Sequence, residues 1–174
     1  NRSLAFTLIA VNIASIDAEK SNEVFLKAVM AVESIKDGSD ELKVISFIAE
    51  SLSKVRPQKV MDLFRKLILI TDKIQNSAAK ARYLKDIAKH LSYVNPDISR
   101  EVFLKAVNET GKIQADNYKS SIFTDIIKSL IRIKPRPYRE VLSQLITASE
   151  KINDDSIKYI VISRLADAVT YMKI

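Results

Sequence analysis

Apolar residues recur along this chain with a period of about 39 residues. Two columns of the repeat contain Ile9, Ile48, Ile87, Ile126 and Leu165, and Ala10, Ala49, Ala88, Ile127 and Ala166. The sequence Glu-Val-Phe-Leu-Lys-Ala-Val occurs at residues 23–29 and again at 101–107, two periods further on. A fixed period between about 20 and 50 residues is typical of a repeat array, in which one supersecondary unit stacks on copies of itself.

Within each period, two segments have the apolar spacing of an α-helix. Starting from Val24, and again from Val44, apolar residues lie at positions i, i+1, i+4, i+5, i+8 and i+11. This spacing forms a broad stripe on a helix and lacks the alternation of a strand. We expect a single repeat domain over 1–174, with a half repeat at 1–18 and repeats at 19–57, 58–96, 97–135 and 136–174. The prediction is about nine helices of about 15–17 residues, joined by short turns that make neighbouring helices antiparallel.

Prolines and capping residues fall at the boundaries of these segments. Pro57, Pro96 and Pro135 form one column just before each first helix. Proline suits the first helical turn because its missing N–H is not needed there, and Asn95 is placed to cap the helix that Pro96 begins. Another column, which Gly38 opens, contains Ser77, Asp116 and Asp155. We expect the last three residues to be the N-caps of the second helices.

The paired helices, the small residues Ala49, Ala88 and Ala166 early in the second helices, and the proline between units resemble tetratricopeptide-type and HEAT-type solenoids. We expect two helices to approach closely at Ala49 and Ala88. The tetratricopeptide period is 34 and its first helix carries a tryptophan, whereas this chain has no tryptophan. The resemblance therefore implies a two-helix solenoid related in kind to both families. We expect an all-α fold, a right-handed superhelix of antiparallel helical hairpins.

The amino-acid composition excludes several kinds of catalytic and metal-binding site. The chain has no cysteine, which excludes disulfides, zinc–thiolate sites and thiol catalysis. His90 is the only histidine, and no glycine-rich phosphate loop or metal-ligand spacing occurs. We therefore expect no enzyme activity, no cofactor and no metal. No apolar run approaches the roughly 18 residues that cross a bilayer, so we expect no membrane partner, and the lack of cysteine fits the reducing cytoplasm.

The net charge of +7 is concentrated in one repeat. Residues 58–96 contain eight basic and three acidic residues. The positions expected to form an outward basic strip are Arg82, Lys85, Lys89, Lys128, Arg132, Lys134, Arg136 and Arg139. Such a strip is a candidate surface for nucleic acid or another polyanion, although Asp86 and Asp125 interrupt it. Acid–lysine pairs such as Glu23–Lys27 and Asp62–Lys66 have the i, i+4 spacing of solvated ion pairs.

Stacked helical hairpins usually bind a protein or peptide on an extended surface. The outward positions of the first helices form the column Met30, Leu69, Asn108 and Thr147. Met30 and Leu69 are apolar where the pattern predicts exposure, so they are candidates for a groove that holds a partner helix or strand. The alternative is that they fill gaps between repeats. The leading hypothesis is a non-enzymatic scaffold, and the alternative is a polyanion adaptor.

Both terminal helices carry apolar residues without a predicted cover. The first helix lacks a preceding partner for Leu8 and Ile9, and the last has Tyr159, Ile160 and Tyr171 at columns that are polar or small elsewhere. Exposed apolar area costs about 25 cal/mol per Å². We therefore expect either a longer parent array or self-association through the terminal helices.

Overall fold

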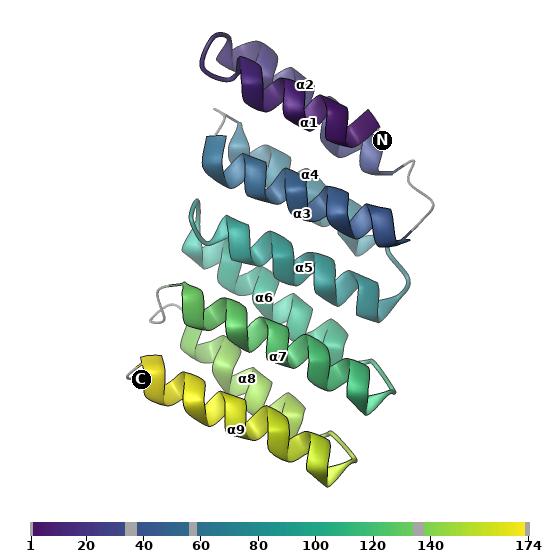
Figure 1. The fold of residues 1–174 in the computed structure, drawn as a ribbon, viewed down its shortest axis with the longest axis vertical. Coiled ribbons are helices and arrows are strands. Elements are labelled where there is room, and N and C mark those ends of the chain that lie inside the picture. Colours follow the sequence, from purple (N-terminus) through teal and green to yellow (C-terminus); the bar gives the residue numbers. More distant parts are fainter. Residues whose placement is uncertain (1, 34–37, 56–58, 134–137, 173–174) are drawn as a thin grey trace. The chain divides into compact units, whose positions relative to one another are not determined.

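The computed structural model describes residues 2–33, 38–55, 59–133 and 138–172. The helices formed by these residues are α1 (Arg2–Ile13), α2 (Ala18–Val32), α3 (Gly38–Val55), α4 (Val60–Asp72), α5 (Ser77–Leu91), α6 (Pro96–Gly111), α7 (Asp116–Arg132), α8 (Arg139–Ser149) and α9 (Asp155–Met172) (Figure 1). The described residues thus form nine helices and no strand, which confirms the all-α prediction. The handedness of a superhelix stays a prediction.

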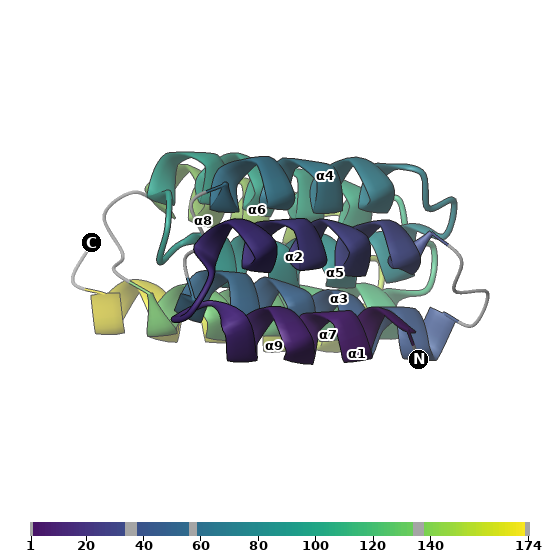
Figure 2. The same ribbon diagram turned by 90° about the horizontal axis from the view of Figure 1, so that it is seen from above.

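The chain forms two compact units, unit 1 (Asn1–Ile74) and unit 2 (Gln75–Ile174). In unit 1, α1 and α3 lie in one layer and α2 and α4 in the other (Figure 2). In unit 2, α5, α7 and α9 form one layer and α6 and α8 the other. The boundary between the units falls within the predicted repeat at 58–96. Alternation of first and second helices between two layers is the packing expected of stacked hairpins.

One hairpin in each unit brings two helix backbones close together. In unit 1, Ser21 on α2 donates its hydroxyl to the carbonyl oxygen of Ala10 on α1 at 2.8 Å. In unit 2, Ser99 on α6 donates to the carbonyl oxygen of Ala88 on α5 at 2.7 Å. The two serines lie two repeat periods apart, as do the two copies of Glu-Val-Phe-Leu-Lys-Ala-Val. A serine side chain reaches a facing helix backbone only where small residues let the helices approach, which confirms the close approach expected at Ala88.

The apolar columns form the core. Ile48, Ile87 and Ile126 are fully buried and Leu165 is 2 % exposed, but Ile9 in the same column is 50 % exposed. The stripe of an inner helix touches both its hairpin partner and a neighbouring repeat, whereas no described helix precedes α1. The expected exposure at the first helix is therefore confirmed.

For two helices, the residue that caps the N-terminus lies one position before the predicted one. Asn95 caps α6, as expected, by accepting from the N–H of Ile98 at 3.1 Å, and Pro96 is the first helical residue. However, Asn76, not Ser77, caps α5, and Asp154, not Asp155, accepts from the N–H of Ile157 before α9. In each case the preceding residue is also a good cap, and the backbone of Asn76 is extended, as an N-cap requires. Pro57 and Pro135 lie outside the described residues.

The third predicted cap, Asp116, is used in a different way. The residue before it, Ala115, occupies the N-cap position of α7 and makes no side-chain bond. The Asp116 carboxylate instead accepts from the backbone N–H groups of Asn153 and Asp154 at 2.9 and 3.1 Å. The Lys119 ammonium lies 3.2 Å from the same carboxylate, and that lysine is buried. Asp116 therefore ties the start of α7 to the turn before α9.

Three helices are shorter than the sequence predicts. α1 has 12 residues, α4 has 13 and α8 has 11. Before α8, the buried ring of Tyr138 meets the ring of Phe103 edge-on, with centroids 5.7 Å apart, and its hydroxyl donates to Ser99 at 3.1 Å. The start of α8 at Arg139 thus follows a tyrosine that is packed against α6.

Candidate functional site

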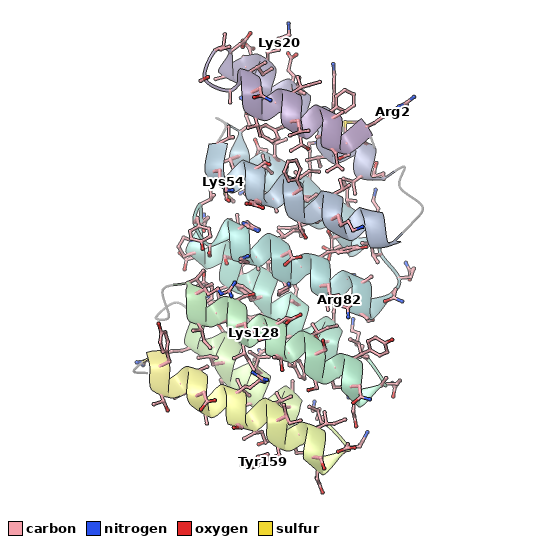
Figure 3. All side chains as sticks on the ribbon, in the orientation of Figure 1. Arg2, Lys20, Lys54, Arg82, Lys128 and Tyr159 are labelled. Carbon is pink, nitrogen blue, oxygen red and sulfur yellow. The ribbon has the colours of Figure 1, made fainter. Side chains whose placement is uncertain are left out.

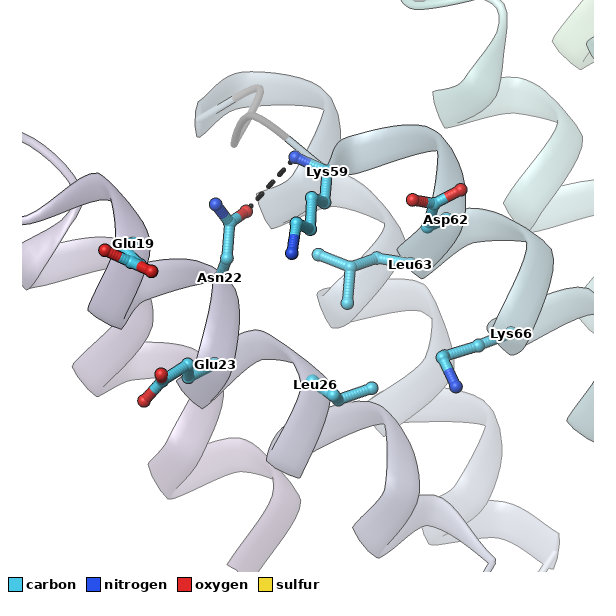
Figure 4. A pocket seen from close by; sticks show the side chains of 8 residues that line it. All are labelled: Glu19, Asn22, Glu23, Leu26, Lys59, Asp62, Leu63 and Lys66. Atoms are coloured by element: carbon cyan, nitrogen blue, oxygen red, sulfur yellow. Dashed lines mark hydrogen bonds between the residues drawn. The ribbon is translucent and has the colours of Figure 1, made fainter.

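Unit 1 contains a groove between its two first-type helices, α2 and α4. It has a volume of about 520 Å³. Its lining residues are Glu19, Asn22, Glu23 and Leu26 from α2, and Lys59, Asp62, Leu63 and Lys66 from α4 or the residue before it (Figure 4). These eight residues define the α2–α4 groove. Its mixture of apolar and charged side chains can accept an amphipathic ligand.

The spacing along each helix explains why these residues share a surface. The four residues of α2 follow i, i+3, i+4 and i+7 from Glu19, and the four on the other wall follow the same spacing from Lys59. Side chains three, four and seven residues apart lie on one face of an α-helix. Because α2 and α4 are adjacent in one layer, the two faces form opposite walls of one groove.

Polar contacts join the two walls at both ends. At one end, Asn22, which is buried, accepts a hydrogen bond from the backbone N–H of Lys59 at 3.3 Å. At the other end, the Lys73 ammonium lies 2.6 Å from the Glu33 carboxylate. Both contacts thus connect residues of α2 and α4, or residues next to these helices. The side chains of Leu26, from α2, and Leu63, from α4, also line the groove (Figure 4).

The predicted partner-binding column is exposed along its whole length. Met30 is 58 % exposed, Leu69 is 61 % exposed, and Asn108 and Thr147 are exposed too. Met30 follows Leu26 by four residues and Leu69 follows Lys66 by three, so they extend the two walls of the α2–α4 groove. The exposure of Met30 and Leu69 weighs against the alternative that they fill gaps between repeats.

Asn108 and Thr147 belong to the matching helices of unit 2, α6 and α8. There, Arg100 occupies the position that corresponds to Asn22 in unit 1. Its guanidinium lies 3.8 Å from Glu140 on α8 and 3.6 Å from Asp97 on α6. An ion pair therefore joins α6 to α8 in unit 2. At the corresponding positions of unit 1, the side chains of α2 and α4 line the groove.

The two predicted acid–lysine pairs of unit 1, Glu23–Lys27 and Asp62–Lys66, are not formed. Asp62 makes its ion pair with Arg65, at 3.4 Å, instead of with Lys66. Within the described ranges, neither Glu23 nor Lys66 takes part in an ion pair. All four side chains are exposed, which agrees with the predicted solvated face, and Glu23 and Lys66 in addition line the α2–α4 groove.

The predicted polyanion strip is only partly accessible. Lys85 is 16 % exposed and lies 2.6 Å from the Asp86 carboxylate, so the expectation that it faces outward is wrong. Arg82 and Lys89 are half-buried on α5, whereas Lys128, Arg132 and Arg139 are exposed. Arg82 and Lys128 are labelled in Figure 3. Asp125 lies 4.0 Å from Lys128. Lys134 and Arg136 lie outside the described residues. The accessible positive charge is thus smaller than the sequence indicates.

Among the described residues, the groups with shifted pKa values belong to unit 2 and are not part of the groove lining. Burial alone would raise the pKa of Glu109, but the hydrogen bond from Lys112 and the charges of Lys80 and Lys112 lower it overall. The hydrogen bond from the backbone N–H of Asp154 lowers the pKa of Asp116, and burial opposes this effect. The hydrogen bonds from Lys119 and from the backbone N–H of Asn153, and the charge of Lys119, lower the pKa further. Burial raises the pKa of Tyr138. These shifts belong to structural contacts between helices and do not mark a reactive site.

No cluster of three or more His, Asp or Glu residues that could hold a metal ion occurs in the part of the chain that the structure describes. His90, the only histidine, is half-buried on α5. In the described ranges, none of the helices combines the length and the apolar character needed to cross a membrane.

Sequence reasoning identified Met30 and Leu69, which lie next to the groove, but it assigned none of the eight lining residues to a binding site. A signal was present, because Glu19 and Lys59 begin the same i, i+3, i+4, i+7 set on two successive first-type helices. The pattern does not show, however, that these sets face each other across an open groove.

No protein-family model matches this chain, and no curated protein matches it. Among solved structures, the chain is similar to Ton1535 from Thermococcus onnurineus NA1, with a TM-score of 0.58 and 19 % sequence identity. The alignment covers 94 % of this chain and 49 % of that one, so the chain spans about half the length of its structural neighbour. At this identity the similarity shows the fold alone: the chain has the helical fold of Ton1535.

Proposed function

We propose that this chain is a non-enzymatic scaffold that binds a protein or peptide on its first-helix surface, and that the α2–α4 groove of unit 1 is the binding site. The proposal includes a two-helix solenoid of the tetratricopeptide or HEAT kind. A chain without cysteine is compatible with a reducing compartment, and we place its action in the cytoplasm.

The observation that carries the proposal is the groove itself. A concavity of about 520 Å³ has the size of a site that buries several side chains of a ligand. Met30 and Leu69 extend its apolar lining into solvent, where large apolar side chains are unfavourable unless a partner covers them. The groove lies open between α2 and α4, so a ligand does not have to separate the helices.

The test is selection of random peptides displayed on phage against the purified chain. We expect peptides with a shared apolar pattern to be enriched. Their affinity should fall at least tenfold in the double variant Met30→Asn, Leu69→Thr, because burying each apolar side chain contributes about 1.5–3 kcal/mol. This variant introduces the residues that unit 2 has at the matching positions, 108 and 147.

The matched control is Asn108→Ala with Thr147→Ala, which changes the equivalent surface of unit 2. Binding should be unchanged in this variant. Circular dichroism and thermal unfolding check that both variants fold. Failure to enrich any peptide, or enrichment of peptides that bind equally well to both double variants, would contradict the proposed site.

A further inference from the structure

The two walls of the α2–α4 groove carry opposite charge. Glu19 and Glu23 lie one helical turn apart on α2, and Lys59 and Lys66 lie on the opposite wall (Figure 4). All four side chains are exposed. In the part of the chain that the structure describes, none of the four is held in an ion pair. Asp62, the acidic residue on the α4 wall, differs because Arg65 pairs with it.

An apolar strip runs between the charged walls. Leu26 and Leu63 form its first part, and Met30 and Leu69 continue it toward the ion pair of Glu33 with Lys73. From Glu19 to Glu33 the α2 wall spans about 14 residues, which corresponds to about 20 Å of helix. The groove, together with the exposed surface that continues it to Glu33, is therefore long enough for about four turns of a second α-helix laid along it.

We infer that the occupant of this groove is an amphipathic α-helix of a partner protein, with basic residues on one flank of its apolar stripe and acidic residues on the other. The inference rests on the proposed function and specifies the class of partner. The apolar stripe covers Leu26, Met30 and Leu69. The basic flank faces Glu19 and Glu23, and the acidic flank faces Lys59 and Lys66.

The opposite charge of the walls also determines the direction of the bound helix. Turning an amphipathic helix end to end exchanges the walls that its two flanks face. Only one direction then places basic side chains against α2 and acidic side chains against α4, and the reverse direction places like charges together at both walls. In unit 2, Arg100 pairs with Glu140 across the equivalent helices, so that surface lacks the same selectivity.

The experiment uses the full chain and two synthetic peptides of identical composition, each long enough for about five turns of α-helix. One peptide has its lysines and glutamates segregated on opposite flanks of a leucine stripe, and the other has them mixed on both flanks. We expect the segregated peptide to bind about tenfold more tightly, since several exposed ion pairs each contribute modestly. The difference should shrink at high salt.

Charge-reversal variants test the direction. Glu19→Lys with Glu23→Lys should weaken binding of the segregated peptide about tenfold, because like charges then meet along one wall. Adding Lys59→Glu and Lys66→Glu should restore binding with the peptide reversed. A spin label at the peptide N-terminus, read by paramagnetic broadening of chain resonances, reports that direction. The matched control, Asp97→Lys with Glu101→Lys, makes the same changes on α6 and should have no effect.

Each outcome separates this inference from the function on which it rests. Equal binding of both peptides, together with loss of binding in Met30→Asn, Leu69→Thr, would overturn the charge-selected helix while leaving the groove as the binding site. Tighter binding of an extended, proline-containing peptide would overturn the helical occupant. Binding that no change in the groove affects would overturn both.

Discussion

The sequence Glu-Val-Phe-Leu-Lys-Ala-Val lies in α2 of unit 1 and in α6 of unit 2, and its buried side is used in the same way twice. Phe25 and Phe103 are fully buried, as are Ala28 and Ala106. In both units a serine two residues before the repeated sequence donates a hydrogen bond to a backbone carbonyl of the preceding helix. Where two helices pack this closely, few substitutions are tolerated at the buried positions, because larger side chains would force the helix backbones apart.

The outer side of the same two helices differs. Met30 in unit 1 corresponds to Asn108 in unit 2, and both positions are exposed. Exposed positions carry little packing constraint, so they can differ without affecting the fold. We therefore expect the matching exposed surfaces of units 1 and 2 to differ in what they bind. A substitution in one unit can then serve as the control for the same substitution in the other.

The largest expected effect is at the close helix pairs. Ala88→Phe should destabilise unit 2 by about 1–3 kcal/mol, because the ring cannot enter between α5 and α6 without moving them. Ala10→Phe, at the matching position of unit 1, should destabilise that unit for the same reason. Urea and thermal unfolding measure both changes. Unchanged midpoints for Ala88→Phe would show that this crossing is not close-packed.

A smaller effect is expected at Tyr138, whose counterpart in unit 1 is Val60. Tyr138→Phe removes the hydroxyl that donates to Ser99 and should destabilise the chain by about 1 kcal/mol, the usual contribution of one hydrogen bond. Thermal unfolding of Tyr138→Phe, with Tyr118→Phe on an exposed ring as the control, measures this contribution. Equal unfolding midpoints would mean that the Ser99 contact does not contribute.

Acid should weaken unit 2 through Asp116. The pKa of this carboxyl is lowered below its ordinary value of 3.8 by bonds that exist only in the folded state. Its stabilisation is therefore present above the ordinary pKa and is lost as the pH falls through the lower folded-state pKa. The matching residue of unit 1, Gly38, has no carboxyl.

Asp116→Asn tests this difference between the units. The variant should be less stable at neutral pH, because Lys119 loses its counter-charge, and its melting temperature should depend less on pH in the acid range. Asp155→Asn, at a carboxyl that is 94 % exposed, is the control. Hydrogen exchange at acidic pH should show earlier loss of protection in α7 and α9 than in α1 and α2. If the melting temperatures of the wild type and Asp116→Asn change with pH in the same way, Asp116 is not the source of the acid sensitivity.

The weakest expected effect is association through the terminal helices. Ile9 in unit 1 and Tyr171 in unit 2 are 50 % and 73 % exposed. We predict a mass that rises with concentration in light scattering, because burying this apolar area is favourable. Ile9→Lys and Tyr171→Lys, made separately, should show which terminal helix contributes more. A constant monomer mass at high concentration would exclude both surfaces.

Much of the fold could be predicted from the sequence because its signals are local and repeated. The i, i+4 spacing predicts helices, and the recurrence of Ile48, Ile87 and Ile126 predicts a shared core position. Capping residues were misplaced where two candidates are adjacent, as at Asn76 and Ser77, since the choice depends on the local backbone conformation.

The candidate site was harder to predict because it joins residues from two helices that are far apart in the sequence. Met30 and Leu69 were identified because they are apolar at exposed positions. Glu23 and Lys66 were not, because the sequence also offers each of them a nearby partner of opposite charge. Whether such partners meet depends on rotamers and neighbouring helices, which a periodic pattern does not contain.

The sequence by itself determined the helical repeat, because both the helical periodicity and the regular spacing between repeats are carried by the order of apolar residues alone. The tertiary structure alone decided which members of each column are covered and which charges pair. It also decided where two helix faces leave a groove between them. These properties depend on distances between segments far apart in the chain, where packing against each particular neighbour determines burial.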